Sequence, residues 1–304
     1  MNPKERVIAA LELREPDDIV PTFELEFQLT REFFDKDFRN LRDLSGKELD
    51  LAIGYNSELF IQIAETFDYS IIRTGDTRIL RKLVQMGANK KYLLCGEADG
   101  TMSIPNGENM VNIAVRLFED ADAVKKGLDA SVDNGIQSGK VQIDAGAECL
   151  TMCADYCFNV GPFLSPKMFS EFVTPYLHRL IEAHRENGAY VIKHTDGNIM
   201  PVLDQLVSCR PHALHSIDPQ AKVSLAEVKK LIGDKVCLAG NVNCGLLQTG
   251  TDDEVKADIM RSLRDGMPGG GYIFCTSNVA FKGMPPERYS VMMDMRKVYG
   301  RYDG

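Results

Sequence analysis

The sequence predicts an α/β protein in which parallel strands close into a (β/α)8 TIM-type barrel. Short segments rich in branched apolar residues begin near positions 140, 189, 213, 236 and 271. A helical pattern follows each of them, and this alternation of strand and helix is typical of a parallel sheet. No G-x-G-x-x-G motif occurs at a strand-to-helix turn, so a dinucleotide-binding open sheet is disfavoured.

The first half of the chain is expected to be less regular and to begin with a helix. Asn2 can cap this helix, whose first turn holds Pro3 and Glu5, a pattern that marks a helix start. We interpret the stretch 76–105 as an inserted β-ribbon. In order, the predicted elements are a helix over 3–13, a strand over 19–25, helical and irregular chain over 28–66, a strand over 70–75, ribbon arms at 78–83 and 90–94, a helix over 120–136 and a strand over 140–145.

Capping residues mark the helices of the second half. Ser165 and Pro166 open a helix with an apolar stripe that ends at Gly188. Capping boxes stand at 224–227 and 251–254, and each predicts a helix start. The other predicted elements are strands over 189–194, 213–218, 235–240 and 271–275, a helix over 199–208 and a final helix from Pro285. We predict a single barrel domain over 1–304.

Composition and charge limit the class of partner. The chain of 304 residues is 44% hydrophobic and 26% charged, with a net charge of −9. Because no basic cluster offsets this charge, nucleic acid and acidic membranes are disfavoured as partners. No apolar run approaches the roughly 18 residues of a membrane helix, and the N-terminus lacks a signal-peptide pattern, so we expect a cytoplasmic protein. Its eight cysteines are then expected to be thiols, most of them buried.

The segment from Tyr190 to Gly197 is the first candidate for a functional site. It places His194 and Asp196 two residues apart at the end of an apolar strand. Alternate residues of a strand point the same way, so the two side chains can face one spot. The alternative is that Asp196 serves an ordinary turn and that His194 is a packed residue.

The C-terminal ends of barrel strands form one rim, where the sites of such folds are built. Acids, amides, His and Cys gather at these predicted ends, and such ligands suit a divalent metal. Zinc is the first choice, bound by His194, Asp196 and Cys275. Alternatively, Cys275 is a core residue, or Asp and His form a metal-free acid–base site. The polar residues at these ends are Glu24, Glu26, Asp144, Glu148, Asp155, His194, Asp196, His215, Asp218, Asn241, Asn243, Cys275, Ser277 and Asn278.

Several motifs, most of them after residue 160, are together specific enough to indicate a family. They are Gly161-Pro-Phe-Leu-Ser-Pro166, Pro175-Tyr176, His194-Thr-Asp-Gly-Asn198, Leu238-Ala-Gly-Asn-Val242, Gly269-Gly-Gly-Tyr-Ile273 and Pro285-Pro-Glu287. On these motifs the chain resembles the uroporphyrinogen decarboxylase superfamily, and within it the branch of corrinoid-dependent methyltransferases. The resemblance implies a (β/α)8 barrel with its site at the strand C-termini.

The two branches of this superfamily differ in their expected site residues. True decarboxylases carry an arginine-rich N-terminal motif that binds the acidic side chains of a porphyrin. The corresponding segment here, 20–27, contains Glu24 and Glu26, which would repel a polycarboxylate. The resemblance therefore disfavours porphyrinogen decarboxylation.

The methyltransferases of the superfamily hold zinc through His-x-Cys and a distant Cys. His194 matches that His, whereas Asp196 and Asn278 stand in place of the two Cys, with Cys275 three residues before Asn278. A site without thiolates is harder and less specific for zinc, and other acids such as Glu24, Glu26 or Glu148 are available as ligands. Such a site suits a methyl group linked to oxygen or nitrogen.

The resemblance thus implies a methyltransferase that moves a methyl group from a small methylated substrate to a corrinoid protein. His194 and Asp196 would act on the leaving heteroatom. Residues expected to meet the substrate are Glu24, Glu26, Asp155, Asn241 and Asn278. Two alternatives remain, namely a decarboxylase-type lyase that works without metal and a non-catalytic relative that binds a corrinoid or another ligand.

Overall fold

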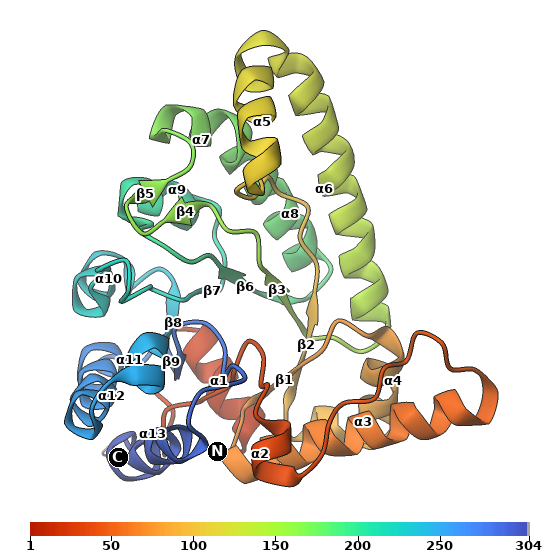
Figure 1. The fold of residues 1–304 in the computed structure, drawn as a ribbon, viewed down its shortest axis with the longest axis vertical. Helices are drawn as coiled ribbons and strands as arrows, with labels where there is room; N and C mark the ends of the chain where they lie inside the picture. Colours follow the sequence, from red (N-terminus) through yellow and green to blue (C-terminus); the bar gives the residue numbers. More distant parts are fainter. Residues whose placement is uncertain (303–304) are drawn as a thin grey trace.

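The computed structural model describes residues 1–302 and shows a curled sheet of parallel strands surrounded by helices (Figure 1). Seven strands pair in the order β1-β2-β3-β6-β7-β8-β9, which confirms the predicted α/β barrel class. The last two positions of the predicted domain, 303 and 304, lie outside the described residues. The barrel strands are β1 (Ile71–Arg73), β2 (Leu93–Glu97), β3 (Cys149–Met152), β6 (Tyr190–His194), β7 (Ala213–His215), β8 (Cys237–Val242) and β9 (Tyr272–Thr276).

Helices cover the outside of this sheet, and a small hairpin lies at its mouth. The hairpin strands are β4 (Cys157–Phe158) and β5 (Gly161–Pro162). The helices are α1 (Pro3–Leu11), α2 (Thr30–Phe34), α3 (Gly46–Phe67), α4 (Thr77–Gln85), η1 (Ala88–Lys90), α5 (Gly107–Glu119), α6 (Ala121–Asp144), α7 (Pro166–Phe172), α8 (Thr174–Glu186), η2 (Met200–Val202), α9 (Leu203–Ser208), α10 (Leu225–Ile232), α11 (Cys244–Thr249), α12 (Asp252–Gly266) and α13 (Pro286–Tyr299).

Extended chain around Thr22 occupies the gap between β9 and β1. Thr22 pairs in parallel with Phe274 of β9, and its carbonyl accepts the amide hydrogen of Ser70, next to β1, at 2.7 Å. Pro21 lacks an amide hydrogen, which interrupts a regular ladder here. The strand predicted over 19–25 therefore has the expected place in the barrel but forms only isolated bridges.

Helix α1 closes the N-terminal end of the barrel. Asn2 and Glu5 form the capping box that starts it, as the sequence predicts. Its residues Val7, Ala10 and Leu11 join the interior cluster of the barrel. Small thiols fill much of that interior, since Cys95, Cys149, Cys237 and Cys275 belong to the same cluster. All eight cysteines are free, and seven of them are buried.

The β-ribbon predicted near 76–105 is wrong. The first proposed arm is helix α4, which Asp76 caps through the amides of Arg78 and Ile79. The second arm, 90–94, runs from the end of η1 into β2, a barrel strand that pairs in parallel with β1 and β3. A short apolar run fits either a strand or a helix by its periodicity alone. The cap at Asp76 was the signal that separates the two.

The strand predicted over 140–145 is also wrong, because these residues end the long helix α6. Val132, Gly135, Gly139 and Gln142 form its buried face at three- and four-residue spacing, which is helical periodicity. The barrel strand comes slightly later, as β3. The helix predicted from Ser165 to Gly188 is divided into α7 and α8, with Pro175 at the start of the second.

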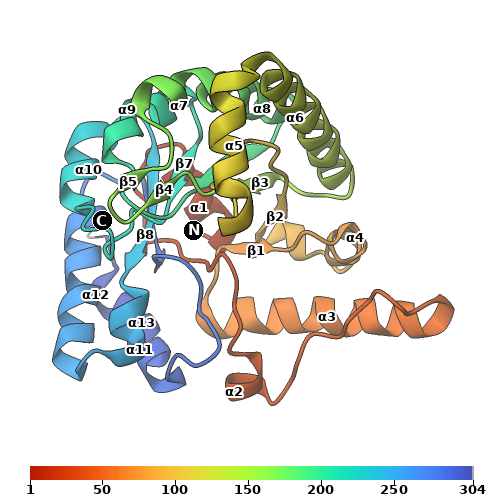
Figure 2. The same cartoon turned by 45° about the horizontal axis from the view of Figure 1, so that its top comes forward.

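Two long helices extend beyond the barrel wall, α3 along one side and α6 beside α5 and α8 (Figure 2). Helix α3 spans 22 residues and α6 spans 24. Within residues 1–302, no helix has both the length and the apolar character that crossing a membrane requires.

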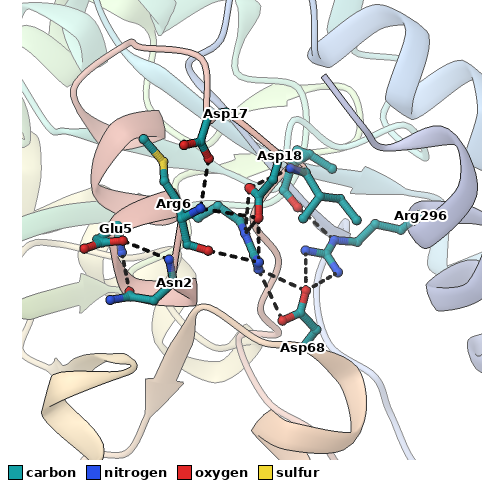
Figure 3. Close-up of polar contacts among 10 residues, drawn as sticks. Asn2, Glu5, Arg6, Asp17, Asp18, Asp68 and Arg296 are labelled. Carbon is teal, nitrogen blue, oxygen red and sulfur yellow. Dashed lines mark hydrogen bonds and ion pairs between the residues drawn. The ribbon is translucent and has the colours of Figure 1, made fainter. Parts of the chain in front are cut away.

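A charged network ties the N-terminal helix to the last helix (Figure 3). Arg6 of α1 donates to both carboxylate oxygens of Asp18 at 3.0 Å and to Asp68 at 3.0 Å. The fully buried Arg296 of α13 donates to the same Asp68 at 3.2 Å and to the carbonyl of Val20 at 2.8 Å. Asp68 therefore balances two guanidinium groups where α1, the end of α3 and α13 meet.

We predict that Asp68→Asn destabilises the fold, because it leaves the buried Arg296 without its anionic partner. Asn tolerates the left-handed backbone that Asp68 adopts (φ 53°), so the change tests charge and not strain. Since Asp68 is partly exposed, the expected loss in the free energy of unfolding is about 2 kcal/mol, below the full effect of breaking a buried pair. Urea unfolding of the pure protein measures it.

The matched control is Asp294→Asn on α13, which breaks an exposed pair with Lys297. An exposed pair contributes less than about 1 kcal/mol. Equal losses in the two variants would contradict the role assigned to Asp68.

Candidate functional site

Two buried histidines meet at the mouth of the barrel. His194 ends β6 and His215 ends β7, and the parallel register sets them side by side. Their Nδ1 atoms lie 2.8 Å apart. A hydrogen bond at this distance requires that one ring carries its proton on Nδ1 and the other does not. The pair therefore fixes the orientation of both rings and leaves Nε2 of His194 directed elsewhere.

That Nε2 atom faces two carboxylates. It lies 3.8 Å from Oδ1 of Asp155 and 3.8 Å from Oδ1 of Asp196. One ligand atom of each of the three residues lies within 4.8 Å of the other two. Asp155 comes from the loop after β3 and Asp196 from the loop after β6. The ends of two neighbouring strands thus supply one nitrogen and two oxygen donors to a single spot.

Neutral donors hold the carboxylate of Asp196 in place. Ser216 donates its hydroxyl to Oδ1 at 2.7 Å, and Asn278 donates its side-chain amide to Oδ2. The backbone amide of Asp196 donates to Oδ1 of Asp155 at 2.9 Å. Burial, with the nearby charges of Asp155 and Asp218, raises the pKa of Asp196 to about 7 although Ser216 acts against it. Crowded carboxylates of this kind favour a bound cation.

The turn after Asp196 can be made only with glycine. Gly197 has a φ of +84°, and a Cβ at this position would lie 2.4 Å from the carbonyl oxygen of Cys157. Its amide donates to Oδ2 of Asp218 at 3.1 Å. The glycine therefore lets the loop after β6 approach the hairpin β4–β5 closely enough to set Asp196 beside His194.

A buried ion pair holds the loop that carries Asp155. Lys193 is fully buried, and its Nζ donates to the carbonyl of Ala154 at 2.8 Å and to Asp99 at 3.3 Å. Asp99 in turn accepts the amide of Ala154 at 2.9 Å. Lys193 precedes His194 on β6 and points to the opposite side of the strand. One strand therefore positions the imidazole directly and Asp155 indirectly.

The three donors fit a divalent cation. For metal–ligand distances of about 2.0–2.1 Å, tetrahedral ligands lie roughly 3.4 Å apart. Nε2 of His194 lies only slightly farther than this, 3.8 Å, from each carboxylate, and the side chain of Asp155 is 44% exposed and has room to move closer. If Nδ1 of His194 donates to His215, its Nε2 lone pair is free for a metal. Such a second hydrogen bond is usual for metal-binding histidines.

The other residues proposed for the site are only partly brought together. Asn278 contacts Asp196 and so belongs to it. Asn241 is fully buried, and its side chain bonds to Ile217, Arg261 and Ser262, which ties β8 to the loop after β7 and to α12. Its predicted contact with substrate gains no support from this arrangement.

Cys275 is not part of the three-residue group. It lies in the apolar interior cluster, where burial raises the pKa of its thiol well above the usual range. The alternative stated for it, a core residue, describes this position, and its prediction as a metal ligand gains no support. Glu148 lies at the other end of β3, paired with Lys4 of α1 at 2.6 Å, and Asp144 ends helix α6. Neither faces His194.

Comparison with known proteins identifies the family. Residues 102–299 match the family described as Uroporphyrinogen decarboxylase (URO-D). The chain belongs to this family. It is 24% identical over 203 residues to the uroporphyrinogen decarboxylase of Pseudoalteromonas translucida, covering 64% of this chain and 54% of that protein. It is 26% identical over 178 residues to that of Aliivibrio salmonicida, covering 55% and 46%.

The chain spans about half the length of the curated URO-D relatives that it matches. Among solved structures, it is similar to a methyltransferase from Methanosarcina mazei, with a TM-score of 0.73, 16% identity and coverage of 98% of both chains. At this identity the likeness concerns the fold, and it extends the barrel assignment to the N-terminal third that the family match leaves out.

Several residues that shape the mouth of this barrel were not among the site residues predicted from the sequence. Lys193, Asp99 and Ser216 act through backbone and side-chain contacts that no spacing in the sequence reveals. Arg73 is different, because it lies within the strand predicted over 70–75, so its place near the rim could have been recognised. In the structure it donates to Thr151 at 2.7 Å and to Glu97 at 2.7 Å, and so bridges the ends of β1, β2 and β3.

Glu24 and Glu26, both predicted to meet substrate, have different surroundings. Glu26 is exposed, whereas Glu24 is buried and accepts hydrogen bonds from Thr276 and Tyr289. Burial raises the pKa of Glu24 to about 8 against the effect of these donors. Near neutral pH the carboxyl group of Glu24 is therefore mostly protonated.

We predict that Glu24→Gln makes the stability of this URO-D fold less dependent on pH. A raised pKa means that Glu24 contributes stability fully below its unfolded pKa near 4.5 and loses it as pH rises to about 8. As pH rises from 5 to 8, the free energy of unfolding of the wild type should therefore fall relative to that of the variant, by on the order of 3 kcal/mol. Urea unfolding at several pH values measures the difference, and Glu26→Gln is the exposed control. Parallel curves for Glu24→Gln and the wild type would contradict it.

Proposed function

We propose that the chain is the methyltransferase component of a demethylation system. In this role it moves a methyl group from a small O- or N-methylated substrate to a corrinoid carried by a partner protein. The observation that carries the proposal is the group of Asp155, His194 and Asp196 at the ends of the barrel strands. The full-length fold likeness to a methyltransferase supports it.

Asp155, His194 and Asp196 would hold a divalent cation, for which zinc remains the first candidate. Bound there, the cation would supply a Lewis acid that draws electron density from the heteroatom of the substrate. His215 keeps the imidazole of His194 oriented, and Ser216 and Asn278 keep Asp196 oriented. Because these partners are neutral, they do not cancel the negative charge that a cation requires.

The overall transfer balances simply. The bond that breaks joins the methyl carbon to oxygen or nitrogen, and its electron pair stays with that heteroatom. The methyl carbon would form its new bond with the electron pair of Co(I) in the partner's corrinoid, and the heteroatom would take up a proton from water at the mouth. The chain contributes binding and orientation of the substrate, and it excludes water from the His194 side, where both histidines are buried.

The second candidate is a decarboxylase-type lyase, which the names of the curated relatives favour. The charge at the mouth opposes a polycarboxylate substrate, since Glu26, Asp155, Asp196 and Asp218 all lie there. The guanidinium of Arg73 already donates to Leu25, Thr151 and Glu97. A lyase would therefore need a smaller acid as substrate and would work without a corrinoid partner.

We expect one zinc ion per chain to bind and His194→Ala to weaken its affinity more than 100-fold. Asn278→Ala should weaken it about tenfold, because it removes only a residue that orients a ligand. Calorimetric titration of the zinc-free protein measures both, and the exposed His178→Ala variant is the control. Unchanged zinc affinity in His194→Ala would rule out this site.

We also expect methyl transfer to depend on an added corrinoid protein and to fall at least 1,000-fold in kcat/KM for Asp155→Asn and His194→Ala, since each removes a ligand of the cation that would act on the heteroatom. Spectroscopic detection of the methylated corrinoid measures the transfer. Turnover of a small carboxylic acid to carbon dioxide without any corrinoid protein would instead favour the lyase.

A further inference from the structure

A cavity of about 240 Å³ lies at the barrel mouth, between the segment 24–27, helix α3 and strand β1. None of the three metal-site residues lines it. Its walls are mainly apolar, and the aromatic rings of Phe27, Phe38, Phe60 and Tyr69 face it. Phe38 and Phe60 are partly exposed and lie 4.5 Å apart between ring centroids, so they form its outer edge.

Of the acidic and basic side chains that line the cavity, those of Arg73 and Glu24 are already hydrogen-bonded. Arg73 donates from Nη1 to the carbonyl of Leu25 at 2.8 Å, and its other donors reach Thr151 and Glu97. The carboxyl oxygens of Glu24 accept from Thr276 and Tyr289. Neither group therefore presents a free charge to a ligand, and Glu26 faces solvent.

We propose that this cavity binds a neutral molecule with a single aromatic ring. The identity of the methyl donor rests in addition on the proposed function: if the chain transfers a methyl group, a donor that binds in this cavity is an aryl methyl ether. The ring would occupy the aromatic pocket, and the methoxy group would point to the mouth.

Size supports one ring. An engineered apolar cavity of about 150 Å³ holds benzene, so 240 Å³ accommodates a ring with one or two small substituents. A porphyrin macrocycle is several times larger. Aromatic walls contact a flat ring through edge and face, which adds to the gain from burial alone.

Charge decides against ionic ligands. A quaternary ammonium ion would gain from the aromatic rings but would lie against the guanidinium of Arg73. A carboxylate would meet the negative charge of Glu26 and would find Arg73 already bonded. A neutral ring avoids both costs, and the protonated state of Glu24 near neutral pH fits this choice.

The cavity adjoins the metal site through Arg73. Its guanidinium lines the cavity and also donates to Thr151 at the end of β3, with Cys153 at 3.7 Å. Asp155 follows two residues later in the same loop. The guanidinium of Arg73 therefore lies between the cavity and the start of the loop that carries Asp155.

The experiment measures equilibrium binding to the full chain by calorimetry, with chelator present and without any corrinoid protein. The probes are methoxybenzene, tetramethylammonium, 4-methoxybenzoate and cyclohexyl methyl ether. We expect methoxybenzene to bind with a Kd in the millimolar range or tighter, and at least tenfold more tightly than each of the others.

Two variants localise the binding. Phe60→Ala removes one aromatic wall, and Ile63→Phe fills the cavity from α3; each should weaken methoxybenzene binding at least tenfold. Leu51→Ala changes an exposed residue of the same helix and should leave binding unchanged. Because the filling variant adds apolar contacts, its thermal midpoint should not fall, which separates a filled pocket from a damaged fold.

The outcomes separate this proposal from the proposed function. Tighter binding of either ion, no binding of methoxybenzene, or full binding in both Phe60→Ala and Ile63→Phe would overturn the pocket assignment. Arene binding localised by the variants, without any methyl transfer, would support the pocket and count against the methyltransferase. Methyl transfer from a non-aromatic donor, without arene binding, would support the enzyme and reject the aryl ether.

Discussion

The alternation of side chains along β6 is the constraint on which the mouth depends. Successive residues of a strand point to opposite faces, so His194 faces the barrel interior and Lys193 faces the helices. The imidazole meets His215 of the next strand. The ammonium group meets the loop after β3 and holds it through Ala154 and Asp99. A shift of β6 by one residue would exchange these two faces and would remove both contacts at once. The geometry of the site therefore depends on the register of this strand.

The opposite end of the barrel solves a different problem, which is to keep the strands in place without occupying the mouth. Helix α1 fills the N-terminal opening with Val7, Ala10 and Leu11. The guanidinium groups of Arg6 and Arg296 then bind this helix to α13 through Asp68 (Figure 3). Apolar packing and this charged network therefore hold the closed end without using the polar groups of the open end. This division is the usual one in barrels of this type.

The barrel and the position of its rim could be predicted from the sequence, because alternation and capping boxes are local signals. His194 could be found for the same reason, since it ends an apolar run. The ribbon at 76–105 and the strand at 140–145 failed because short apolar runs fit helix and strand equally, and the deciding contacts are distant in sequence. Lys193 and Ser216 escaped notice for a related reason. Their roles depend on carbonyl and carboxylate groups of other loops, which only the closed barrel brings near.

The two positions where the resemblance led us to expect thiolates have a joint explanation. Asn278 donates to Oδ2 of Asp196. The residue at the second expected Cys position therefore orients the residue at the first and does not add a ligand. The missing donor has a substitute on the other side, because Oδ1 of Asp155 lies 3.8 Å from Nε2 of His194. The donor set thereby changes from nitrogen and sulfur to nitrogen and oxygen. Carboxylate oxygens donate less electron density to a cation than thiolates do, so a metal in this site would be the stronger Lewis acid. That property suits the release of an alkoxide, a phenolate or an amine, each of which is a poor leaving group without a cation to stabilise it.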